Sequence, residues 1–99
     1  MDTNRTDELL EYLCHGFLTL QTPEECLKFL QDLCTPSELQ EMSRRLHAAK
    51  MLTKNHIYAD IADVTGLSTA TISRVNRCLK YGDEGYRTVL DRLERKAHY

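Results

Sequence analysis

Apolar residues recur every three or four positions along almost the whole chain, and this helical spacing restricts the fold more than any other feature. Leu9, Leu13, Phe17 and Leu20 mark one apolar stripe in a helix expected at about residues 5–20. Five further helices are expected: one from Pro23 onward, and others at about 36–54, 57–65, 69–80 and 84–97. No alternation of period two is long enough for a strand. The chain is therefore predicted to be all-α with six helices.

Two segments of the same type mark the starts of the second and third helices. They read Thr22-Pro23-Glu24-Glu25 and Thr35-Pro36-Ser37-Glu38. A threonine oxygen can cap a helix N-terminus, proline suits the first helical position, and a glutamate three residues later can complete a capping box.

The composition fits a single small domain. The chain has 99 residues, of which 41% are hydrophobic and 28% charged. No run of about 18 apolar residues could cross a membrane, and the acidic start does not resemble a signal peptide. Four cysteines lie among apolar residues without a C-x-x-C pair, at positions Cys14, Cys26, Cys34 and Cys78. We interpret them as small buried side chains in a reducing, cytoplasmic protein.

The net charge of −2 conceals a strong asymmetry. Residues 1–42 hold nine acids and two bases, whereas residues 43–99 hold six acids and eleven bases. Such a division indicates that the second half meets an anionic partner, although a solvated helix face would look similar.

Residues 58–77 have the form of a helix-turn-helix. Ala62 is small enough for a second helix to cross closely, and Gly66 suits a turn that needs positive φ. Ser68 is a good N-cap for the next helix. Four apolar side chains would form the core between the two helices, namely Ile61, Leu67, Ile72 and Val75. A structural helical corner that binds no nucleic acid is the alternative.

The second helix of this motif would present small and basic side chains to DNA. Hydroxyl and methyl groups at its front suit base edges in the major groove. The bases further back suit phosphates. The candidate contacts are Thr69, Ala70, Thr71, Ser73, Arg74, Arg77 and Lys80, together with Arg44 and Arg45 from the basic preceding helix.

Enzymatic and metal-binding functions have no supporting pattern. His15, His47, His56 and His98 are far apart without the companion residues of a zinc motif. No serine has a nearby His/Asp pattern, and no glycine-rich phosphate loop is present. We therefore expect neither catalysis, nor a cofactor, nor a metal.

The segment from Thr35 to Lys80 resembles the tryptophan repressor family, in its YerC/YecD-like branch. The marks are the Thr-Pro-x-Glu helix start, Arg45, and the run from Gly66 through Ala70-Thr71-Ile72-Ser73 to Arg74. The resemblance implies one domain over 1–99 that forms an intertwined homodimer. Dimerisation helices would occupy 1–54, the helix-turn-helix 57–80 and a C-terminal helix 84–97. The implied role is transcriptional regulation, most often repression, at a pseudo-palindromic operator.

The resemblance also marks a ligand pocket that this sequence alters. Arg45 and Arg74 occupy the positions of the two arginines that enclose the corepressor indole. Val75 stands where tryptophan-binding members have glycine, and Cys78 where they have serine. Because a valine side chain would fill part of the indole slot, tryptophan is not expected to be the effector. The two arginines would then contact DNA phosphates or hold a different small ligand. A helical protein-interaction module is a further alternative.

Overall fold

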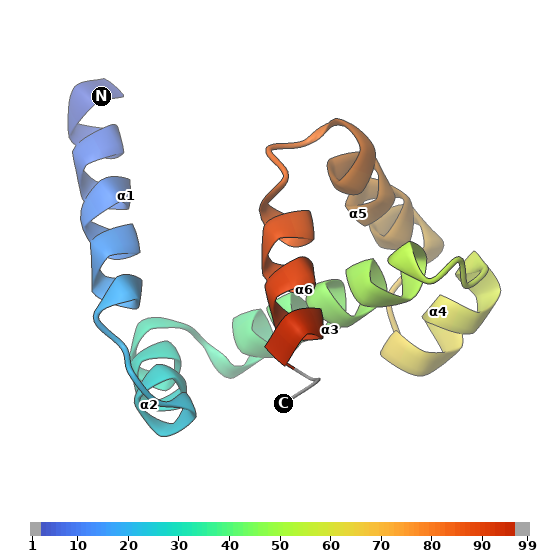
Figure 1. Cartoon of the computed structure of the whole chain (residues 1–99), viewed down its shortest axis with the longest axis horizontal. Coiled ribbons are helices and arrows are strands. Elements are labelled where there is room, and N and C mark those ends of the chain that lie inside the picture. The colour runs from blue at the N-terminus through green and yellow to red at the C-terminus, as the bar shows by residue number, and fades with distance from the viewer. Residues whose placement is uncertain (1–2, 97–99) are drawn as a thin grey trace. The chain divides into compact units, whose positions relative to one another are not determined.

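The computed structural model describes residues 3–96 and contains six helices, with no strand in that range (Figure 1). Their bounds are α1 Thr3–Leu18, α2 Pro23–Leu33, α3 Pro36–Thr53, α4 Tyr58–Thr65, α5 Thr69–Tyr81 and α6 Gly85–Lys96. The all-α prediction with six helices is confirmed. The chain forms two compact units, residues 1–39 and residues 40–99, which are described separately below.

Threonine side chains start α2 and α3 as expected. In α3, Glu38 N–H donates to Thr35 Oγ1 at 3.2 Å, and Thr35 N–H donates to Glu38 Oε1 at 2.8 Å, which completes a capping box. In α2, Glu25 N–H donates to Thr22 Oγ1, but the Glu25 carboxylate accepts from Gln21 N–H at 2.9 Å. A complete capping box would have the Glu25 carboxylate accept from Thr22 N–H. The prediction of that box in α2 is therefore wrong by one residue.

The first helix ends earlier than its apolar stripe does. The prediction placed its end near residue 20, whereas α1 stops at Leu18. Thr19 N–H and the Thr19 hydroxyl both donate to the Gly16 carbonyl, which closes the last turn. The last helix was predicted to reach residue 97, which lies outside the described residues.

The first unit has almost no interior of its own. No side chain between residues 5 and 39 is buried. The rings of Phe17 and Phe29 meet edge to face with centroids 5.1 Å apart, and they form its main internal contact. Leu9, Leu10 and Leu18 remain 66%, 58% and 81% exposed. Several large apolar side chains of α1 and α2 are thus left in solvent, although Leu13, Phe17 and Leu20 are half-buried.

The second unit has a core built on two adjacent alanines of α3. Ala48 packs in a cluster with Met51 and with residues of the α4–α5 pair, namely Ile61, Leu67 and Ile72. Ala49 packs with Val75 and Leu79 of α5, against which Tyr86 and Leu90 of α6 lie. Both alanines are fully buried, so α3 contacts helices on two sides at close range.

The structure corrects our interpretation of the cysteines. Cys14 and Cys78 are exposed, Cys26 and Cys34 are half-buried, and all four are free. Cys14 lies on α1. Cys78 lies next to buried Leu79 on α5 and therefore points to another side of the helix. Within residues 3–96, no helix combines the length and apolar character that a membrane span requires.

Candidate nucleic-acid interface

The turn between α4 and α5 is held by backbone geometry and one buried hydroxyl. Gly66 has a φ of 75°, in the left-handed region, and its N–H donates to Ala62 O at 2.8 Å. The Thr65 hydroxyl donates to Ile61 O at 2.7 Å and accepts from Leu67 N–H at 3.2 Å. Thr65 is only 6% exposed, so these two bonds satisfy a polar group inside the motif.

Three apolar positions hold α5 against the rest of the second unit. Ile72 is fully buried, and Val75 and Leu79 are 2% and 6% exposed. Ile61 of α4 is also fully buried, and half-buried Ala62 packs on the same cluster. This packing decides which side of α5 faces the solvent.

The N-terminal front of α5 is open to solvent. Ser68 caps the helix by accepting from Thr71 N–H at 3.1 Å, and its own hydroxyl donates to Thr71 Oγ1. Thr71 is half-buried and engaged in this cap. The remaining candidate contacts on α5 are all exposed, namely Thr69, Ala70, Ser73, Arg74, Arg77 and Lys80.

The charge of this helix is entirely positive. Between Thr69 and Tyr81 the sequence has three bases and no acid. Positive charge on a helix whose first turn exposes only small side chains suits close approach to a phosphate-lined groove.

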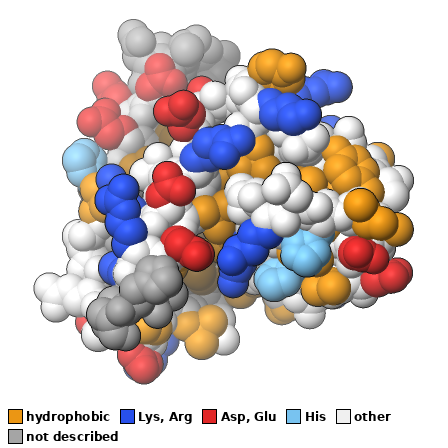
Figure 2. All heavy atoms as spheres, turned by 45° about the vertical axis from the view of Figure 1, so that its right-hand side comes forward, with side chains coloured by type: hydrophobic (Ala, Val, Ile, Leu, Met, Phe, Trp, Pro, Cys, Tyr) orange, Lys and Arg blue, Asp and Glu red, His pale blue; other side chains and the backbone are white. Residues whose placement is uncertain are grey.

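The two arginines of α3 differ in their surroundings. Arg44 is exposed and lines a hollow of about 270 Å³ with Ser43, His47, Val64 and Thr65. Arg45 is half-buried and pairs with Glu41, with Nη2 and Oε1 3.2 Å apart. Figure 2 shows histidine side chains next to basic ones on the right-hand part of the view.

The four residues of the altered ligand pocket do not share one environment. Arg74 and Cys78 are exposed, whereas Val75 is buried between α3 and α5. Tyr86 of α6, which the sequence did not single out, lies near two of them. Burial raises the pKa of the Tyr86 phenol, the Cys78 thiol adds to the rise, and Arg45 opposes it. Arg45 and Cys78 therefore lie close enough to Tyr86 to interact electrostatically.

No three metal-binding side chains gather within residues 3–96. His15 lies 3.6 Å from Glu11 one turn earlier on α1, and both side chains are exposed. His98 lies outside the described residues.

The fold and the exposed front of α5 define a small helical protein of the helix-turn-helix class. Residues 8–94 match the family model of the Trp repressor protein. The chain therefore belongs to the tryptophan repressor family. This family is a regulatory, DNA-binding one and not a family of enzymes.

Individual relatives agree with this assignment. YerC of Bacillus subtilis (strain 168), which is uncharacterized, is 47% identical over 85 residues, which cover 86% of this chain and 82% of YerC. The crystal structure of a TrpR-like protein from Eubacterium eligens ATCC 27750 has a TM-score of 0.84 and 46% identity. It covers 88% of this chain and 90% of that one. A candidate Trp repressor from Staphylococcus aureus has the same score and identity, covering 88% and 87%.

Proposed function

We propose that this protein is a sequence-specific DNA-binding regulator of transcription. It acts as a homodimer and represses transcription. The observation that carries the proposal is the exposed, acid-free front of α5, held outward by the Gly66 turn and by buried Ile72 and Val75. In this proposal Thr69, Ala70 and Ser73 approach base edges in the major groove. Arg77 and Lys80, further back on α5, bind phosphates.

The uncovered apolar surface of the first unit supports the homodimer. A stable domain does not leave this many large apolar side chains in water unless a partner covers them. A second copy of α1 and α2 carries the same stripes and can bury both sets by interleaving. A two-fold dimer would present two α5 helices about 34 Å apart to successive major grooves, and the operator would be pseudo-palindromic.

Tryptophan is not the effector in this proposal. Val75 is packed against Ala49 and Leu79, and the neighbouring Tyr86 lies over the same cluster. An indole ring would have to displace packed atoms. Isothermal titration should show no saturable tryptophan binding below about 100 μM.

DNA binding can be tested by selecting bound fragments from a genomic library and measuring affinity at two salt concentrations. Affinity should fall steeply between about 50 and 200 mM salt, because bound phosphates release counterions. Arg77→Ala should weaken binding to all sequences and lower the salt slope by about one, whereas Ser73→Ala should change preference among sequences.

Arg92→Ala is the matched control for these variants. Arg92 is an exposed base on α6 and belongs to none of the proposed contacts. An equal loss of affinity in Arg92→Ala and Arg77→Ala would contradict the assignment of α5 as the reading helix. Salt-independent binding to another protein, with no DNA binding, would favour the interaction-module alternative instead.

A further inference from the structure

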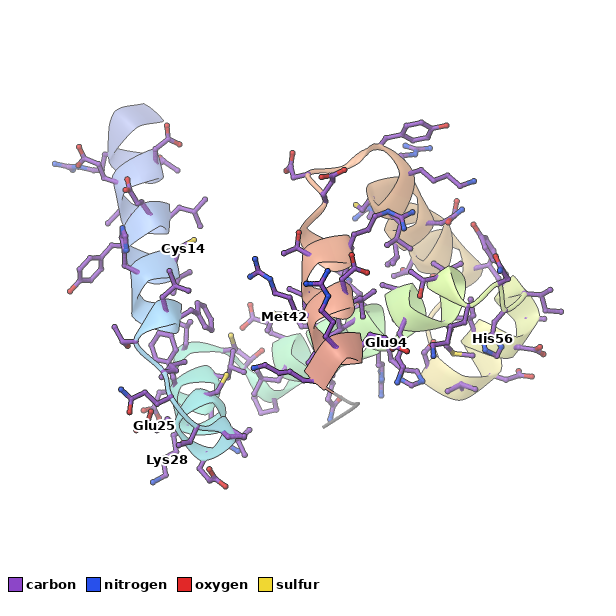
Figure 3. All side chains as sticks on the ribbon, viewed as in Figure 1. Cys14, Glu25, Lys28, Met42, His56 and Glu94 are labelled. Atoms are coloured by element: carbon purple, nitrogen blue, oxygen red, sulfur yellow. The ribbon has the colours of Figure 1, made fainter. Side chains whose placement is uncertain are left out.

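A hollow of about 430 Å³ lies where the end of α3, the second half of α5 and the first turn of α6 meet. Its volume falls in the range of about 300–1,000 Å³ that is typical of small-molecule sites. Figure 3 labels His56, one of its lining residues, just after the end of α3. The polar side chains around it are Asn55, His56, Asn76, Lys80 and Arg87.

This hollow is separate from the altered ligand pocket of the family resemblance. None of Arg45, Arg74, Val75 and Cys78 lines it. Its α5 residues lie in the last two turns, away from the front of the helix that we assign to base reading.

The end of α3 places two of the polar groups at the rim. Asn55 has a φ of 65°, in the left-handed region that asparagine tolerates better than most residues. Its N–H donates to Leu52 O at 3.1 Å, and His56 N–H donates to Met51 O at 3.2 Å. These two bonds are the Schellman ending of a helix, which fixes the backbone at both positions.

Arg87 is held in one orientation. Its Nε donates to the Leu79 carbonyl at 2.9 Å, which leaves the two terminal nitrogens of the guanidinium free of that contact. Within residues 3–96, neither Arg87 nor Lys80 forms an ion pair. An oriented guanidinium is well suited to bind a phosphate through two parallel hydrogen bonds.

No carboxylate lines the hollow, which distinguishes it from its neighbour. The adjacent hollow of about 400 Å³ also contains Arg87, but it includes Asp91 and Glu94. In that adjacent hollow Lys54 Nζ lies 4.0 Å from Glu94 Oε1, so the carboxylate partly neutralises the positive charge of Lys54. The 430 Å³ hollow keeps two cations with no carboxylate among its lining residues.

From these contacts we infer that the hollow binds a small phosphorylated organic molecule. Arg87 holds the phosphate, while the Asn55 and Asn76 amides donate to and accept from hydroxyl groups of the organic part. Because Asn76 belongs to α5, the bound molecule would restrain the reading helix. That regulatory consequence rests on the proposed DNA-binding function, whereas the binding itself does not.

The test is a titration of the ¹⁵N-labelled full chain with ribose 5-phosphate, followed by NMR at constant ionic strength. Saturable shifts should appear at the Arg87 Nε–H and the Asn76 amide, with a dissociation constant below about 10 mM. Ribose without the phosphate should not produce them. Arg87→Met should raise the dissociation constant at least about tenfold, because it removes charged hydrogen bonds. Asn55→Gly keeps the left-handed backbone and removes only an uncharged amide. It should therefore weaken binding less than Arg87→Met does.

Arg92→Met is the matched control on the same helix and should bind like the unaltered chain. Shifts that fail to saturate, that ribose alone reproduces, or that persist in Arg87→Met would overturn the inference. A DNA phosphate is the other source of the same chemistry. If Arg87→Met weakened DNA binding and lowered its salt slope by about one, the hollow would be a DNA contact and the inference would be wrong. A chain that ignored DNA but still bound ribose 5-phosphate would refute only the proposed function.

Discussion

Gly66 shows how one backbone angle positions the exposed front of α5. Its φ of 75° is unfavourable for a residue with a Cβ atom, yet a Cβ built there would meet nothing within 4 Å. Glycine is therefore favoured at position 66 by the backbone conformation, and not because a side chain would clash with a neighbour.

Gly66→Ala should lower the free energy of unfolding by about 1–2 kcal/mol, which is the usual cost of left-handed backbone. Gly66→Asn should cost less, because asparagine visits this region more readily. Thermal unfolding at one protein concentration measures both variants. Equal stability of Gly66→Ala and the unaltered chain would contradict the assigned φ.

Thr65 presents a second residue-scale prediction. Its hydroxyl satisfies Leu67 N–H and donates to Ile61 O inside the motif. Thr65→Val keeps the shape but leaves a buried N–H without that acceptor, which should destabilise the chain by about 1–3 kcal/mol. Thr65→Ser keeps the hydroxyl and should lose less. Denaturant unfolding of the two variants checks the order, and a more stable Thr65→Val would show that the hydroxyl is dispensable.

Some residue-scale features could be predicted from sequence and others could not. The expected environments of Gly66 and Ser68 follow from local backbone chemistry, which sequence carries directly. Tyr86, Asn76 and Arg87 gain their surroundings from the other helices that pack around them, and no local pattern marks them. The exposure of Cys78 was missed because apolar neighbours in sequence do not fix which side of a helix a residue occupies.

At the scale of the helices, the start of α3 leads to a prediction about how stability depends on pH. The Thr35 N–H and hydroxyl, by hydrogen bonding, hold the pKa of the Glu38 carboxylate below its ordinary value of 4.5. A lowered pKa means that the folded state favours the charged carboxylate. This contribution to stability is present above the ordinary pKa and is lost as pH falls through the folded value.

An NMR titration of the Glu38 carboxyl should therefore have a midpoint below 4.5. Thr35→Ala should move the midpoint up, and Thr35→Ser, which keeps the hydroxyl, should leave it nearly unchanged. Because Thr35→Ala keeps the Thr35 N–H, which is the larger cause of the lowered pKa, the contradicting result is a midpoint at or above 4.5 in the unaltered chain; it would mean that the capping box is absent in solution.

Helix starts were more predictable than the end of the first helix. The Thr-Pro-x-Glu segments specify a cap, a proline and an acidic first turn in four consecutive residues, so α2 and α3 begin where expected. Leu20 continues the α1 stripe, but the Thr19 hydroxyl has already closed the helix on Gly16. Apolar spacing thus overestimated the length of this helix.

At the scale of the whole molecule, the exposed apolar side chains of the first unit lead to a prediction about the oligomeric state. Leu10 is 58% exposed on α1 in the single chain. If a second copy covers it, Leu10→Glu should shift the mass found by equilibrium sedimentation from dimer to monomer and lower the unfolding temperature. Glu8→Gln, an exposed polar change on the same helix, should do neither. A monomeric mass for the unaltered chain at micromolar concentration would contradict the proposed homodimer.

Ala48 and Ala49 have a mechanical consequence for such an assembly. A methyl group has no rotamers, so the contact at these two alanines cannot adjust by turning side chains, whereas Met51 in the same α3 surface can. Displacing α3 at the alanines would therefore carry α4 and α5 along with it or open a gap. In the proposed homodimer, a signal that moves this part of α3 would then reach the reading helix α5 through the two alanines.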